Sequence, residues 1–145
     1  MMKKIFALAA LLLTLSFTAC KKEAVEELDN NSTQASITGI WELSSIDTKV
    51  SIGSVNVSVY IEFGSTGNFI IYQKIGDGRY SKFTGIYTLS TDNTLSGTYS
   101  NSSSWGPYYV AFGDNTLSLT SAGGKETDTY KKISAIPETV VKNVY

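Results

Sequence analysis

The chain of 145 residues contains no histidine and a single cysteine, Cys20. The lack of histidine excludes Ser-His-Asp and Cys-His catalytic arrangements and most types of zinc site. A lone cysteine also has no partner for an intramolecular disulfide. The sequence lacks a Walker A motif, a dinucleotide-binding fingerprint and a calcium-binding loop as well. We therefore expect neither a metal nor an organic cofactor.

Carboxylates are the remaining candidates for catalysis, because a glycosidase needs only two of them facing each other. They fall mainly on polar strand faces or in turns: Glu42, Glu62, Asp77, Asp92, Asp114, Glu126 and Asp128. Asp77 lies between Gly76 and Gly78, which is the composition of a turn. Solubility and turn formation are the expected roles of these carboxylates. We predict that the protein is not an enzyme, and hydrolase activity stays the weakest of three hypotheses.

Long apolar runs are also scarce, and the first one, residues 5–13, follows Lys3 and Lys4. Together with the small residues Thr18 and Ala19 it predicts a secretory leader over residues 1–19, too short to span a membrane permanently. Removing this leader takes away two of the 12 basic residues and none of the 13 acidic ones, which leaves a net charge of −3. Such a balance argues against nucleic acid as a partner.

The cysteine ends the leader in the sequence S-F-T-A-C, residues 16–20. This stretch resembles the lipobox of bacterial lipoproteins, with Phe17 where leucine is usual. The resemblance implies that Cys20 is acylated, for example with palmitate, and becomes the mature N-terminus. Each methylene buried in a bilayer stabilises such an anchor by about 0.8 kcal/mol. The membrane is then a partner through Cys20; the alternative is an ordinary leader that happens to contain a cysteine.

Residues 21–36 are charged or polar and contain no aromatic side chain. Their composition is typical of a chain that cannot bury enough surface to fold. We interpret residues 20–36 as the lipidated cysteine and a flexible tether with a span of roughly 20–25 Å; a short helix over residues 23–28 is the alternative. The acidic cluster resembles the export signals of Bacteroidetes lipoproteins. That resemblance implies the cell envelope, in particular the outer membrane, facing either the periplasm or the surface.

From residue 38 onward, apolar residues alternate with polar ones, which predicts strands separated by short turns. In the first strand Trp41 and Leu43 share one side, so that the indole can face a core, and Gly39 leaves room beside it. The predicted strands are 38–46, 55–63, 68–75, 79–90, 94–100, 107–113, 116–120 and 126–133.

Eight strands with short connections form an antiparallel meander, because parallel neighbours need long crossovers. Closing the meander into an up-and-down barrel removes its two open edges. We therefore predict an all-β fold, an eight-stranded antiparallel barrel, with a β-sandwich as the alternative. Gly85 and Gly97 are places where strands can bend. The side chains expected inside the barrel are Val57, Val59, Ile61, Phe69, Ile71, Tyr87, Leu89, Leu95, Tyr99, Val110, Phe112, Leu117 and Leu119.

Several short motifs carry a family resemblance: G-I-W in the first strand, G-I-Y-T-L and L-S-G-T-Y in the middle, and N-T-L-S-L-T near the end. Together they look like the lipocalin-like domains of Bacteroidetes lipoproteins. The resemblance implies a lipocalin-like barrel over residues 37–133, in which Gly39 and Trp41 close one end. It also implies a short helix in residues 134–145. There Pro137 suits a first turn, and Ile136, Val140, Val141 and Val144 lie near one face; a frayed tail is the alternative.

An eight-stranded barrel either fills its interior with its own side chains or holds one small ligand. Because several predicted inward residues are bulky, we expect a mostly filled core with a cavity near one mouth. The candidate ligand-binding residues are Trp105, which we place in the loop 101–106, Tyr108 and Tyr72. Aromatic side chains there suit a small hydrophobic molecule or a sugar. Trp105 could also serve only as a plug.

Two functions remain open from the sequence. The first is the binding of a small apolar or amphipathic ligand at one barrel mouth. The second is a non-catalytic interaction module, with a fully packed barrel, in a cell-surface complex such as one that handles glycans. The sequence indicates neither the ligand nor the oligomeric state.

Overall fold

The computed structural model describes residues 37–48 and 55–145, which belong to one compact unit. The predicted leader, Cys20 and the tether lie outside the described residues. Eight strands and one short helix follow in order: β1 Gly39–Thr48, β2 Val57–Phe63, β3 Asn68–Ile75, β4 Ser81–Leu89, β5 Thr94–Tyr99, β6 Ser104–Gly113, β7 Thr116–Ser121, β8 Glu126–Ile133 and α2 Glu138–Val141.

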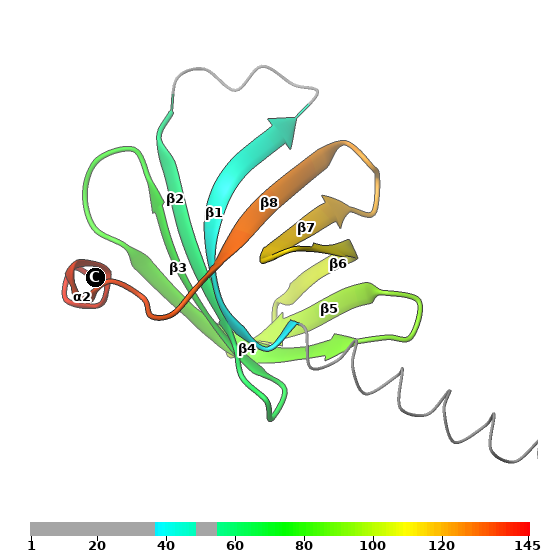
Figure 1. Ribbon diagram of the computed structural model, residues 1–145. Helices are drawn as coiled ribbons and strands as arrows, with labels where there is room; N and C mark the ends of the chain where they lie inside the picture. The colour runs from blue at the N-terminus through cyan, green and yellow to red at the C-terminus, as the bar shows by residue number, and fades with distance from the viewer. Residues whose placement is uncertain (1–36, 49–54) are drawn as a thin grey trace, which may run out of the picture. The chain divides into compact units, whose positions relative to one another are not determined.

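Each strand pairs antiparallel with the next, and β8 pairs antiparallel with β1, so the sheet is a closed barrel (Figure 1). The seam between β1 and β8 extends from the pair Ile40 and Ile133 to the pair Thr48 and Glu126, with a bulge between Leu43 and Ser45. The prediction of an eight-stranded antiparallel barrel is confirmed, and the sandwich alternative is excluded. Closure satisfies the backbone groups that an open sheet would leave unpaired at its edges.

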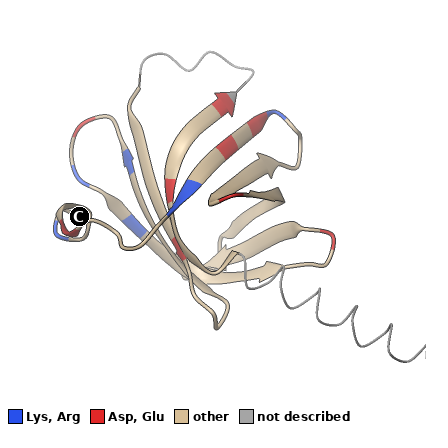
Figure 2. Ribbon diagram, in the orientation of Figure 1, with Lys and Arg blue, Asp and Glu red and all other residues tan. Residues whose placement is uncertain are grey.

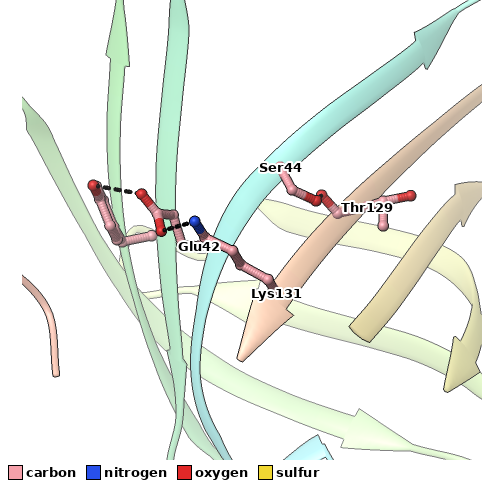
Figure 3. A network of polar contacts seen from close by, with 5 residues as sticks. Glu42, Ser44, Thr129 and Lys131 are labelled. Atoms are coloured by element: carbon pink, nitrogen blue, oxygen red, sulfur yellow. Dashed lines mark hydrogen bonds and ion pairs between the residues drawn. The ribbon is translucent and has the colours of Figure 1, made fainter. Parts of the chain in front are cut away.

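Polar side chains on the outside reinforce this seam (Figure 3). Lys131 Nζ lies 3.0 Å from Glu42 Oε2, and the Tyr60 hydroxyl donates to Glu42 Oε1 at 3.1 Å. The Ser44 hydroxyl donates to the Thr129 carbonyl oxygen at 2.8 Å. Partial burial and the neighbouring Glu42 raise the pKa of Tyr60. An exposed ion pair of this kind stabilises by at most about 1 kcal/mol, so the backbone ladder and the interior carry most of the closure.

The interior follows the alternation of the strands. The buried cluster inside the barrel consists of Ile37, Trp41, Ile61, Phe63, Phe69, Ile71, Leu95, Trp105, Val110, Leu117, Leu119 and Tyr130. Partly buried side chains pack against it: Leu43, Val59, Tyr87, Leu89, Tyr99, Tyr108 and Phe112. Every predicted inward residue except Val57 belongs to one of these two sets. Alternation with a period of two therefore located the core correctly.

Gly85 and Gly97 make room for aromatic rings in this core. A Cβ atom on Gly85 would lie 2.6 Å from Phe69 Cζ and would also overlap the Thr98 carbonyl oxygen. A Cβ atom on Gly97 would lie 3.1 Å from Trp105 Cε3. Since carbon atoms pack at about 3.5–4.0 Å, only glycine lets these rings lie flat against the strands.

Trp41 lies at the end of the barrel where β1 begins. It is 2 % exposed, and its Nε1 donates to the carbonyl oxygen of the fully buried Ile37 at 2.8 Å. Lys132 Nζ lies 5.3 Å from the indole centroid, a distance that allows a cation–π contact. Gly39 has a φ of 136°, a backbone conformation that favours glycine. Ile37 and Trp41 are thus buried at this end of the barrel, which we call the closed end.

A second apolar cluster lies on the outside of β2 and β3, beneath the C-terminal segment. It comprises Tyr60, Tyr72, Tyr80 and Val140, with Ile70, Ile133, Ile136 and Val144 partly buried against it. The segment is also held by backbone bonds from Tyr80 N to Asn143 O at 2.9 Å and from Tyr145 N to Tyr80 O at 3.1 Å. The helix is only one turn long. Val141 is 48 % exposed, so its predicted place on the packed face is wrong.

Candidate functional site: a polar cavity in the barrel

The end of the barrel opposite Trp41 is where β1, β3, β5 and β7 finish. Inward positions of the strands continue there beyond the core, and they carry apolar side chains. Ile46, Ile75 and Phe83 are 37 %, 63 % and 39 % exposed. Phe83 is paired across the ladder with Ile71 and Ile46 with Asp128, two residues that line the cavity. Ile75 follows the inward positions Ile71 and Gln73 on β3. We call these three residues the apolar rim.

A cavity of about 150 Å³ lies inside the barrel towards this end. Its lining combines aliphatic, aromatic and polar side chains: Val59, Ile61, Ile71, Gln73, Tyr99, Trp105, Tyr108, Leu119, Asp128 and Tyr130. An apolar cavity of about 150 Å³ in a protein core holds benzene, so this volume has room for a group the size of one six-membered ring. The polar side chains distinguish it from such a dry cavity.

Trp105 lies on β6, and its predicted position in a loop is wrong. The turn after β5 is tight, with Ser102 N and Tyr99 N donating to Tyr99 O and Ser103 O, each at 2.8 Å. The next strand therefore begins three residues before Pro107, which brings Trp105 opposite Gly97. The indole is 8 % exposed, and its centroid lies 5.0 Å from that of Phe69. Trp105 is thus part of the interior wall of the cavity.

The structure brings two of the three candidate ligand-binding residues together. The rings of Trp105 and Tyr108 lie 5.3 Å apart by centroid, and both line the cavity. Tyr72 belongs to the outer cluster instead, with Lys82 Nζ 5.6 Å from its ring centroid. It lies on the opposite face of β3 because its neighbour Ile71 points inward. The prediction that groups Tyr72 with this mouth is therefore wrong.

Asp128 is predicted on the polar exterior, but it lines the cavity. It stands two positions before the buried Tyr130 on β8 and opposite Leu119 on β7, so it shares their inward face. Burial raises the pKa of Asp128, the nearby Glu126 raises it further, and the Tyr130 hydroxyl acts in the opposite direction. The spacing of two from Tyr130 was the signal in the sequence that could have located it.

Three tyrosines line the cavity together with this carboxylate. Burial is the main cause that raises the pKa values of Tyr99, Tyr108 and Tyr130, and the charge of Asp128 adds to the effect at Tyr108 and Tyr130. These phenols therefore stay neutral at physiological pH. They add hydroxyl groups to a cavity that has a single carboxylate. The remaining wall is mostly aliphatic and comes from β2, β3 and β7: Val59, Ile61, Ile71 and Leu119.

No ion pair within residues 37–48 and 55–145 involves Asp128; the two that the structure shows are Glu42–Lys131 and Glu138–Lys142. Across the same described ranges, no group of three or more cysteine, aspartate or glutamate side chains is arranged to hold a metal ion. The short α2 is not long enough to cross a membrane, and the rest of the described chain offers no helix that could do so.

The fold and the cavity define this part of the chain as an eight-stranded antiparallel β-barrel with a polar interior pocket. No protein-family model matches the sequence, and no curated protein matches it. Among solved structures, the chain is similar to the lipoprotein YedD from Klebsiella pneumoniae subsp. pneumoniae MGH 78578. The two are 13 % identical, with 72 % of this chain and 78 % of that one covered and a TM-score of 0.49.

Proposed function

We propose that the protein is a lipid-anchored, lipocalin-like lipoprotein that binds one small amphipathic molecule in its barrel cavity without catalysing a reaction. The observation that carries this proposal is the cavity itself, in which Asp128 and three tyrosine hydroxyls face an interior that is otherwise apolar. A barrel that served only as a scaffold has no need of a carboxylate inside, because burying a charge without a partner costs free energy.

The amphipathic character of the ligand follows from the two parts of the mouth. The cavity offers polar groups at its wall, whereas the apolar rim of Ile46, Ile75 and Phe83 leaves apolar surface in water. A molecule with a polar group and an apolar chain satisfies both, since its chain removes the rim from water at a gain of about 25 cal/mol per Å².

The anchor is proposed from the sequence alone. Acylation of Cys20 would attach the barrel to a membrane of the cell envelope, and we place it at the outer membrane, facing the periplasm or the surface. Labelling cells with radioactive palmitate tests this proposal. We expect label on the wild-type protein and none on Cys20→Ala, and an unlabelled wild type would refute the anchor.

Native mass spectrometry tests the binding function. The chain from residue 21 to residue 145 omits the leader and the cysteine but keeps every described element, and it can be purified from its own cells. A binder should carry additional mass that denaturation releases, and Trp105→Ala should lose it. A chain that is always free of adducts, and whose tryptophan fluorescence responds to no lipid or sugar in a panel, favours the interaction module instead.

A further inference from the structure

The charge inside the cavity has one sign. Among the described residues that line the cavity, Asp128 carries the one carboxylate, burial keeps the three tyrosines neutral by raising their pKa values, and none is a lysine or an arginine. Acidic residues colour the end of β1 and the start of β8 in Figure 2; these are Asp47, Glu126 and Asp128. Lys125 lies in the exposed turn before β8. Arg79 lines a neighbouring groove, which shares Gln73 with the cavity and Ile75 and Phe83 with the apolar rim, but Arg79 does not line the cavity itself.

A half-buried carboxylate of this kind lacks a compensating charge among the described residues. Neutral hydroxyls can donate hydrogen bonds to it, but only a cation offsets its charge. Glu126 adds to the cost of the Asp128 charge, because the two negative charges repel each other. Within the cavity, the described residues therefore present a negative charge that a positively charged group would offset.

The walls of the cavity suit an organic cation better than a metal ion. Four aromatic side chains line the cavity together with the one carboxylate: Tyr99, Trp105, Tyr108 and Tyr130. Aromatic rings attract ammonium groups through their quadrupoles, and such rings are the usual recognition element for ammonium ligands. A metal ion would need several oxygen ligands with ideal geometry, and the cavity offers a single carboxylate.

Resting on the proposed function, we propose that the polar end of the ligand is an ammonium group that pairs with Asp128 between the aromatic side chains, while its apolar chain extends to the rim. The cavity volume of about 150 Å³ accepts the ammonium group and its first few carbon atoms. An anionic ligand of equal length would meet Asp128 and Glu126 and be repelled. A neutral ligand would gain the apolar contacts but not the charge pair.

Three probes with the same chain separate these cases: octylammonium, octanol and octanoate. Binding to the chain of residues 21–145 can be followed by calorimetry and by quenching of tryptophan fluorescence. We expect octylammonium to bind at least about tenfold more tightly than octanol, and octanoate to bind weakest. Equal or tighter binding of octanol or octanoate overturns the ammonium proposal while leaving the binding function in place. Binding of none of the three refutes both.

Two matched variants identify the group responsible. Asp128→Asn keeps the shape of the side chain and should weaken octylammonium binding by roughly ten- to a hundredfold, with octanol affinity unchanged within about twofold. Asp114→Asn removes the same charge from the exposed turn between β6 and β7, at the closed end of the barrel. It should leave both affinities unchanged. An equal loss in the two variants would show an effect of net charge alone and would overturn the proposal.

Discussion

Replacing Gly85 by alanine tests the packing of the barrel interior more sharply than any truncation. The added Cβ would lie 2.6 Å from Phe69 Cζ and 2.7 Å from Phe69 Cε1, about 1 Å inside normal contact distance. The Phe69 ring cannot move away freely, because its centroid lies 5.0 Å from that of Trp105 and 5.7 Å from that of Tyr99. Overpacking of this kind costs about 1–3 kcal/mol.

The overlap with the Thr98 carbonyl oxygen on the neighbouring strand adds to this cost. We therefore expect Gly85→Ala to lower the free energy of unfolding by at least about 2 kcal/mol, and to lower Tm by roughly 8–16 °C. Urea and thermal unfolding followed by circular dichroism would measure both quantities. A fall in Tm without a change in the urea m-value would assign the effect to the native state.

Gly123→Ala is the matched control. Gly123 lies in the turn between β7 and β8, where the nearest atom to an added Cβ is Lys125 Cγ at 3.9 Å. The same change there should leave stability unaltered or raise it by up to about 1 kcal/mol. If Gly85→Ala were as stable as Gly123→Ala, Phe69 would not lie over this strand and the description of the interior would be wrong.

Three further predictions concern the site, the closed end and the C-terminal segment. Because the pKa of Asp128 is raised above 3.8, the folded state binds its proton more tightly than the unfolded state, and stability falls as the pH rises through the raised pKa. Asp128→Asn should thus be more stable than wild type at neutral pH and lose that advantage below pH 3.8; a less stable variant at neutral pH in thermal unfolding would contradict this. Trp41→Phe removes the hydrogen bond to the Ile37 carbonyl and should lower the free energy of unfolding by about 1–3 kcal/mol, as measured with urea. An unchanged urea midpoint would refute the packing of Trp41 against Ile37 at the closed end. Val140→Ser should make the C-terminal segment sensitive to protease while the exposed neighbour Val141→Ser does not, and equal sensitivity of the two would contradict the docking.

The strand order and the interior were predictable because alternation with a period of two is a strong local signal. Val59, Ile61 and Phe63 alternate with polar residues, and one side of such a strand must be buried. Closure followed from the short turns, which leave no room for crossovers. These are properties of each segment and its immediate neighbours, so a single sequence contains them.

The site was harder to predict because it depends on where strands begin and on which face a polar residue lies. The residues around Trp105 bury nothing and therefore predict a loop, yet backbone bonds in the preceding turn start the strand early. Asp128 was assigned to the exterior by its polarity, although its spacing from Tyr130 places it inside. Tyr72 is predicted at the mouth, but it packs in the outer cluster with Tyr60, Tyr80 and Val140. Polarity alone therefore misplaces the residues that line a polar cavity.

The central claim is that the barrel encloses a pocket that takes the charged end of an amphipathic molecule. Its most direct test is a titration of the isotope-labelled chain of residues 21–145 with octylammonium, followed by NMR. We predict saturable shifts at the Trp105 indole N–H and at the backbone amides of Gln73, Tyr99 and Asp128, with contacts between probe protons and these side chains. Shifts confined to the outer cluster around Tyr72 and Tyr80, with the Trp105 signal unmoved at saturation, would contradict it.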